Sequence, residues 1–114
     1  IDGDYVLSPA YDLLDTRIHV DEESLFALED DLFKEWHWSN CRIQNPDHHP
    51  CKEDFIEFGK TIGINERRVI IILAPFLKKQ PEVENLINRS FLDKETKNIY
   101  RNHYKERLGM LNLV

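Results

Sequence analysis

Five side chains that could bind a soft metal ion lie close together near the middle of the sequence. They are two cysteines and three histidines: His37, Cys41, His48, His49 and Cys51. Zinc in proteins usually takes four such ligands in a tetrahedral arrangement. The spacing here, His-x3-Cys-x6-His-His-x-Cys, matches no common zinc finger or knuckle. We therefore expect an irregular loop without stoichiometric zinc, and keep zinc binding as the alternative that metal analysis would decide.

Two acidic runs and one basic set are the other groups that could hold ions. The acidic runs, residues 21–23 and 29–31, lack the alternating ligands and the glycine of a calcium-binding loop, so we expect solvated helix faces. The basic set is interleaved with acidic residues, which favours ion pairs along a wet helix surface over contact with phosphates. We expect no direct nucleic-acid partner. The basic set consists of Arg89, Lys94, Lys97, Arg101, Lys105 and Arg107, with Asp93, Glu95 and Glu106 between them.

One more carboxylate, Asp12, follows a short apolar stretch and a proline turn near the start of the chain. An aspartate in such a turn often closes the loop by accepting a local backbone hydrogen bond. It can also be a metal ligand at the mouth of a cleft. In phosphoryl transfer, for example, an aspartate holds the Mg²⁺ that bridges ATP phosphates. The residues alone leave both interpretations open.

The composition is that of one small globular domain. The chain has 114 residues and a mass of 13.6 kDa, with 41% hydrophobic and 32% charged residues. Fifteen basic against 21 acidic residues give a net charge of −6, which argues against binding nucleic acid or an anionic membrane through overall charge. The longest apolar stretch, residues 69–74, is too short to cross a membrane, so we expect no membrane partner.

The start of the sequence carries no secretion signal. We therefore expect a cytoplasmic location, in which Cys41 and Cys51 stay reduced. The first residue is Ile1 and the only methionine is Met110, which leads us to expect a piece of a longer chain.

The elements that must position these groups fall into three parts of one domain over residues 1–114. Residues 1–20 are expected to be a hairpin strand followed by the turn that carries Asp12, because Asp2-Gly3 is a hairpin signal and Pro9 turns the chain. Residues 21–51 are expected to hold a helix and then an irregular loop. The helix would cover residues 25–33 and the loop residues 34–51.

Residues 52–114 are expected to form a helical bundle. A first helix from residue 52 ends at Gly63, and Asn65 caps a second helix, which Pro75 ends near residue 74. The second helix is apolar almost all round, so it is expected to be the buried centre of the bundle.

Two further helices complete the expected bundle. Pro81 starts a short one, and Asp93 caps a last one that is longer. The last helix presents one apolar stripe at helical spacing. That stripe consists of Ile99, Tyr100, His103, Tyr104, Leu108 and Leu111.

The first part of the chain resembles a known enzyme family. Residues 2–16, Asp-Gly-Asp-Tyr-Val-Leu-Ser-Pro-Ala-Tyr-Asp-Leu-Leu-Asp-Thr, are similar to the segment that follows the catalytic loop in HipA-like serine/threonine kinases. These kinases are the toxins of bacterial HipA–HipB toxin–antitoxin systems. Further similarities occur in the same order along the chain. They lie at Ala27-Leu28, Glu53-Asp54-Phe55, Gly63-Ile64, Ser90-Phe91-Leu92, and Tyr100 with Arg107.

The resemblance implies a role for Asp12. This residue falls where the family has its second metal-binding aspartate, and Ser8, Pro9 and Tyr11 would shape the turn that presents it. In the family, the catalytic aspartate, the metal-binding asparagine and the nucleotide-binding lobe with its lysine precede this segment, so this chain is expected to hold none of them. The stretch 34–51 departs from the shorter, glycine-containing link expected there.

The resemblance thus implies the helical C-terminal portion of a kinase-like fold, with a short β-hairpin remnant at its start. Mg²⁺ and ATP would bind only to the full-length parent, and no cofactor is expected for this chain alone. Because it holds only one piece of the catalytic machinery, it is expected to be inactive by itself. Its implied partners are the upstream part of the same kinase domain and a HipB-like antitoxin.

The alternative is a stand-alone helical domain that binds a protein partner and catalyses nothing. Trp36 and Trp38 would then form its contact surface, since aromatic side chains are enriched at interfaces. Whether the chain belongs to an enzyme is therefore undecided at the level of sequence.

Overall fold

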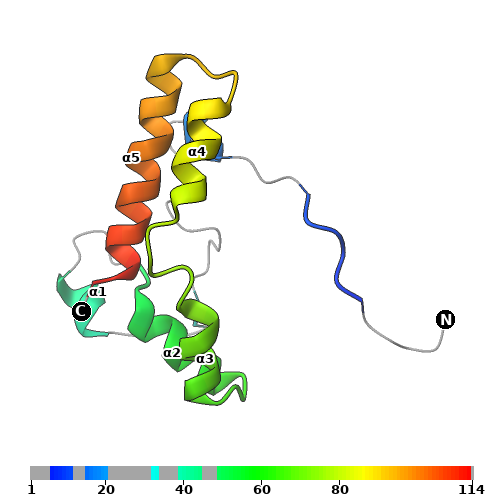
Figure 1. Cartoon of the computed structure of the whole chain (residues 1–114). Coiled ribbons are helices and arrows are strands. Elements are labelled where there is room, and N and C mark those ends of the chain that lie inside the picture. Colours follow the sequence, from blue (N-terminus) through cyan, green and yellow to red (C-terminus); the bar gives the residue numbers. More distant parts are fainter. Residues whose placement is uncertain (1–5, 12–14, 21–31, 34–38, 45–48, 114) are drawn as a thin grey trace.

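The computed structural model describes residues 6–11, 15–20, 32–33, 39–44 and 49–113. Within these ranges the regular structure is helical, and none of the described residues lies in a β-strand. The mainly-α class expected from the sequence is confirmed. The elements, labelled in Figure 1, are a 3₁₀ turn η1 (Thr16–Ile18) and the α-helices α1 (Asn40–Gln44), α2 (Lys52–Thr61), α3 (Glu66–Leu73), α4 (Pro81–Arg89) and α5 (Lys94–Leu111).

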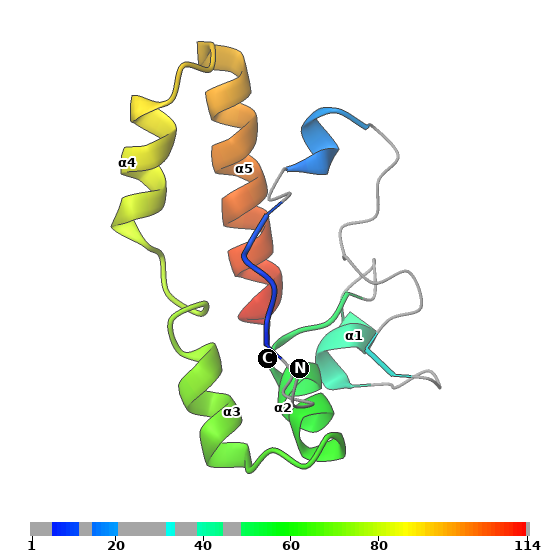
Figure 2. The ribbon, with the colours of Figure 1, turned by 90° about the vertical axis from the view of Figure 1, so that its right-hand side faces the viewer.

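The four longer helices form two antiparallel pairs. Helix α2 packs on α3, and α4 packs on α5, with η1 against α5. Figures 1 and 2 show the two pairs following one another along the length of the molecule, joined by the stretch between α3 and α4. No helix among the described residues has the length and the apolar character needed to cross a membrane.

A close contact joins the first pair. Gly59 of α2 faces Val69 of α3, and a Cβ atom added at Gly59 would overlap the Val69 side chain. Gly63 ends the helix in the left-handed conformation, at φ 83°, which a side chain would disfavour. There its N–H donates to the Lys60 carbonyl at 2.9 Å, and the Ile64 N–H donates to the Gly59 carbonyl at 2.8 Å. This turn brings α3 back along α2.

The expected starts of α3, α4 and α5 are confirmed. Asn65 accepts a hydrogen bond from the Arg67 N–H at 3.0 Å, and Asp93 accepts one from the Thr96 N–H at 2.8 Å. Pro81 is the first residue of α4, where its missing N–H costs no hydrogen bond. Helix α3 ends at Leu73, directly before the residue that the sequence predicted.

The expected burial of α3 is wrong. Only Val69 of this helix is buried, whereas Ile70, Ile71 and Ile72 are between 45% and 62% exposed. Among the described residues, α3 packs extensively only on α2, so its outer face meets no second layer. The apolar sequence of α3 therefore reflects a surface that nothing in the described part of the chain covers.

The expected β-strand near the start is also wrong for the residues that can be checked. Residues 6–11 have no regular structure, and Val6 and Leu7 are 88% and 95% exposed. Figure 1 shows this segment running away from the helices. A strand needs a neighbour for its backbone hydrogen bonds, and none of the described residues supplies one. The rest of the expected hairpin, residues 1–5, lies outside the described residues.

The middle of the chain differs from expectation as well. The stretch 34–51, expected to be an irregular loop, contains the short helix α1. Most of the helix expected over residues 25–33 lies outside the described residues, and Leu32 and Phe33 at its end are not helical. The Phe33 ring packs edge-on against Phe58 of α2, with 6.3 Å between ring centroids.

Candidate functional site

The segment on either side of Asp12 is the first candidate site, and Asp12 itself lies outside the described residues. The preceding residues, Ser8, Pro9 and Tyr11, are exposed, with Tyr11 at 74%. The chain is described again from Asp15 onward, where it returns to the helices. The contacts of Asp15 and of η1 therefore define how this segment is attached.

Two side-chain contacts fix the end of this segment to α5. His103 Nδ1 lies 2.8 Å from the Asp15 carboxylate, and both side chains are less than one-fifth exposed. Because a carboxylate can only accept a hydrogen bond, Nδ1 is the donor. One turn later, Arg17 pairs with Glu106 at 3.0 Å. Together these pairs hold Asp15 and η1 against the middle of α5.

A recess of about 300 Å³ lies beside this anchor, between α4 and α5. Partial burial lowers the pKa of the Arg107 guanidinium there, and the positive charge of Arg17 lowers it further, while Asp15 and Glu106 act in the opposite direction. The lining of the recess therefore combines charged and polar side chains with apolar ones. It is lined by Asp15, Val83, Ile87, Tyr100, His103, Tyr104 and Arg107.

Two basic residues of α5, Lys97 and Arg101, contact α4, whereas the sequence suggested ion pairs along α5. Arg101 pairs with Glu84 of α4 at 2.6 Å and also contacts the side-chain oxygen of Asn88. Lys97 donates to the Asn88 backbone carbonyl at 3.0 Å. The hydrogen bond from Arg101 holds the pKa of the Glu84 carboxyl below its ordinary value. These contacts tie α4 to α5.

The cysteine–histidine cluster is the second candidate site, and here the expectation of reduced thiols is wrong. Cys41 of α1 and Cys51 at the start of α2 are joined by a disulfide. Both are completely buried. His49 is half-buried nearby in sequence, and His37 and His48 lie outside the described residues.

Asp54 lies beside the two cysteines, although the pattern of cysteines and histidines in the sequence did not indicate that this residue belongs to the cluster. One ligand atom from each of Cys41, Cys51 and Asp54 lies within 4.8 Å of the others. With the thiols reduced, these residues would be a donor set for a soft cation. The signal in the sequence was the spacing Cys51-x-x-Asp54, which is the spacing of a capping box at a helix start.

A buried ion pair completes this second site. The Asp54 carboxylate accepts the Cys51 backbone N–H at 2.9 Å and lies 3.3 Å from Arg42 Nε. The Arg42 and Asp54 side chains are both 0% exposed. The arginine belongs to α1 and the aspartate to α2, so the pair crosses between the helices next to the disulfide.

Comparison with known proteins finds one similarity, which covers part of the chain. Over 63 residues, which are 54% of this chain, the sequence is 33% identical to a Haemophilus influenzae protein described as "Putative kinase". That stretch covers 18% of the relative, so the chain spans less than a fifth of that protein's length. No family model matches the chain, and no solved structure matches it significantly. The chain is thus similar, in part, to a kinase-like protein.

Proposed function

We propose that this chain is the C-terminal part of a HipA-like, ATP-dependent serine/threonine kinase. In that role it supplies one Mg²⁺ ligand, Asp12, and is inactive by itself. The observation that carries the proposal is the resemblance of residues 8–16 to the segment after the catalytic loop of these kinases. The partial similarity to a protein described as "Putative kinase" also supports it.

The described residues fit the structural demands of such a role. A metal-binding carboxylate in phosphoryl transfer must be held in a fixed place relative to the nucleotide. Asp15, three residues after Asp12 in the sequence, is tied to α5 by its hydrogen bond with His103. Helix α5, the longest helix among the described residues, would then serve as the rigid support of the metal-binding segment.

The exposed apolar surfaces support the proposal that a partner covers them. Ile70 and Ile71 on α3 and Phe76 just beyond it are exposed, as are Val6 and Leu7. Patches of this kind are uncommon on proteins that act alone. In our proposal the upstream part of the same kinase covers them, and a HipB-like antitoxin binds the assembled kinase. A stand-alone interaction domain would use the same surfaces for a separate protein.

The test compares the chain alone with the full-length protein that contains it. We expect the full-length protein to transfer the γ-phosphoryl group of radiolabelled ATP to itself or to a serine/threonine substrate when Mg²⁺ is present. The isolated chain should show neither transfer nor nucleotide binding. Hydrogen exchange at residues 69–77 should also be slower in the full-length protein, because its upstream part covers α3.

Two results would count against the proposal. A full-length protein that folds but transfers no phosphoryl group would remove the kinase function. Unchanged exchange at residues 69–77, together with a separate protein that slows it, would favour the stand-alone interaction domain.

A further inference from the structure

We propose that Cys41 and Cys51 form a reversible thiol–disulfide site that exchanges with low-molecular-weight thiols such as glutathione. Its oxidation state would decide whether α1 stays fixed to the first turn of α2. This inference concerns a different part of the chain from Asp12 and stands independently of the kinase proposal.

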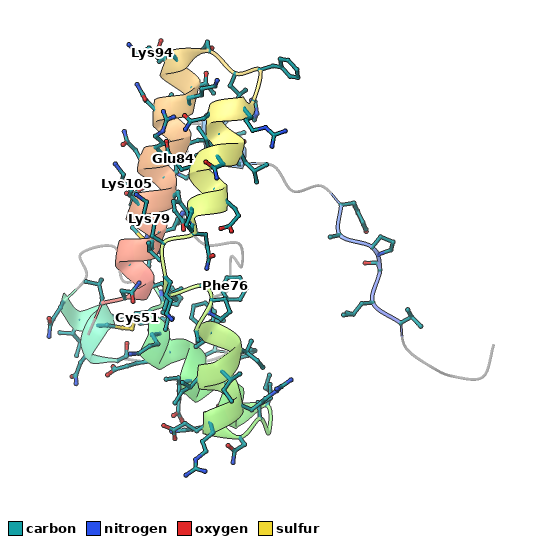
Figure 3. The ribbon with its side chains drawn as sticks, in the orientation of Figure 1. Cys51, Phe76, Lys79, Glu84, Lys94 and Lys105 are labelled. Carbon is teal, nitrogen blue, oxygen red and sulfur yellow. A yellow bond between two sulfur atoms is a disulfide. The ribbon has the colours of Figure 1, made fainter. Side chains whose placement is uncertain are left out.

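The disulfide is a covalent link between α1 and the residue directly before α2, next to the buried ion pair of Arg42 and Asp54. Cys41 is the second residue of α1 and Cys51 immediately precedes α2, with their Cα atoms 6.5 Å apart. Figure 3 shows the bond as a yellow link beside the labelled Cys51, between the two helices. It closes a covalent ring that begins at Cys41 and ends at Cys51.

Helix α1 depends on this link. It has five residues, which is fewer than an isolated helix needs to be stable in water. Its outer side, with Asn40, Ile43 and Gln44, is exposed. When the disulfide is broken, the buried ion pair between Arg42 and Asp54 would still join α1 to α2.

The polar groups around the sulfur atoms suit both oxidation states. In the disulfide state, Asp54 Oδ2 accepts the Cys51 N–H, and the same oxygen lies 3.3 Å from Cys41 Sγ. Ser39 Oγ lies 3.1 Å from Cys41 Sγ. After reduction, the Cys41 thiol can donate to the Asp54 carboxylate or to the Ser39 hydroxyl. The Cys41 sulfur can therefore accept from the Ser39 hydroxyl in the disulfide state, and the thiol has a polar partner after reduction.

The electron balance of the exchange is simple. In reduction, two glutathione thiols give up two electrons and two protons to the protein disulfide, and leave as one glutathione disulfide. The Cys41–Cys51 bond breaks through a mixed disulfide between one cysteine and glutathione. Oxidation is the reverse, with glutathione disulfide as the electron acceptor.

Release of α1 would change a neighbouring recess. Ser39 and Asn40, at the start of α1, line one side of a recess of about 530 Å³. Its other side is formed by α2 and by Glu66 of α3. The lining residues there are Lys52, Glu53, Ile56, Glu57, Lys60 and Glu66. Because the disulfide holds the Ser39 side against α2, its reduction should open this recess.

The burial of both sulfur atoms sets the kinetics. A thiol cannot reach a completely buried disulfide, so reduction must wait for α1 to open. The rate of reduction should therefore rise with the concentration of dithiothreitol and then level off at the opening rate. A rate that stays proportional to dithiothreitol throughout and equals that of a fully exposed model disulfide would mean that the disulfide is accessible, which contradicts this part of the proposal.

The main experiment uses the 114-residue chain purified without reductant. We expect no labelling by N-ethylmaleimide before reduction and two labels afterwards, with the label count following the ratio of reduced to oxidised glutathione reversibly. Hydrogen exchange by mass spectrometry should become roughly 100-fold faster for peptides within residues 39–51 on reduction. Exchange of α4 and α5 should change far less, because the main helix–helix contact of each is with the other.

A matched variant separates the bond from the reductant. Cys41→Ser with Cys51→Ser should show the fast exchange at residues 39–51 in both buffers. If that variant does not fold, the comparison of oxidised and reduced wild-type protein still decides the matter. The proposal is overturned by two labels before reduction, by one equivalent of zinc held on the thiols, or by equal exchange in the two oxidation states.

Discussion

Arg42 and Asp54 form the most buried ion pair among the described residues, and the pair lies where α1 meets α2. Both side chains are 0% exposed, so neither charge is solvated by water. Each charge is instead stabilised by its partner in the pair. Asp54 also accepts the Cys51 N–H, which makes it the polar centre of this junction. Removing one member of the pair is therefore expected to destabilise the fold by more than the intact pair stabilises it.

Replacing Arg42 with Met should destabilise the chain strongly. The substitution leaves the Asp54 carboxylate buried without its cation, which typically costs about 3–5 kcal/mol in the free energy of unfolding. Urea denaturation followed by circular dichroism measures this loss. As a control, Arg67→Met on the exposed surface of α3 should change the free energy of unfolding by less than about 0.5 kcal/mol. Equal small effects of both substitutions would show that the buried pair is not needed.

Glu84 should contribute to the acid sensitivity of the fold. The hydrogen bond from Arg101 holds the pKa of the Glu84 carboxyl below its ordinary value of 4.5. A carboxyl with a lowered pKa stabilises the folded state fully above its ordinary pKa, and this contribution is lost as the pH falls through its folded pKa. We therefore expect Glu84→Gln to reduce the fall in melting temperature as the pH is lowered through and below 4.5.

The matched control for this prediction is Glu82→Gln, which removes the same charge from an exposed position on α4. It should leave the pH dependence closer to that of the wild type. If both variants reduce the fall in melting temperature at low pH equally, the contact between Glu84 and Arg101 has no specific role in that fall.

Among the elements, the pair α2 and α3 depends on a single small residue. Because a Cβ atom at Gly59 would overlap Val69, Gly59→Ala should force the helices apart and destabilise the chain by roughly 1–3 kcal/mol. Gly109→Ala is the matched control, because nothing lies within 4 Å of a Cβ atom there on α5. It should stabilise by about 0.5–1 kcal/mol through helix propensity. Thermal denaturation measures both, and shifts in the same direction would contradict the packing described for Gly59.

The ends of the helices could be predicted from the sequence because their causes are local. Gly63, Asn65, Pro81 and Asp93 each act on backbone groups within a few residues, so the chain itself carries the signal. The same local logic explains why Asp54 could have been found from its spacing to Cys51.

The contacts of the candidate sites could not be predicted in this way. His103 meets Asp15 across 88 positions and Glu106 meets Arg17 across 89, and no local pattern encodes such pairs. The disulfide was missed because the expected cytoplasmic location argued for reduced thiols. The burial of α3 was overestimated because an apolar helix was taken to face a core, whereas its outer face is exposed.

At the scale of the whole molecule, the described residues form two helical pairs with little shared core. The buried hydrophobic residues among them number four: Cys41, Cys51, Val69 and Ile87. Large apolar side chains remain exposed along α3, just beyond it at Phe76, and in residues 6–11. A chain built in this way fits our proposal of a subdomain that packs against the rest of a larger kinase.

Asp12 is the residue on which the proposed function depends, and metal rescue in the full-length protein tests it most directly. Asp12→Cys replaces a carboxylate oxygen with a thiolate, which binds Mg²⁺ poorly and Cd²⁺ well. We predict that phosphoryl transfer from ATP falls by at least about 100-fold with Mg²⁺ and recovers in large part with Cd²⁺. Glu82→Cys should keep the wild-type rate with Mg²⁺. Undiminished activity of Asp12→Cys with Mg²⁺, or a folded variant that no metal restores, would contradict the assignment of Asp12 as a metal ligand.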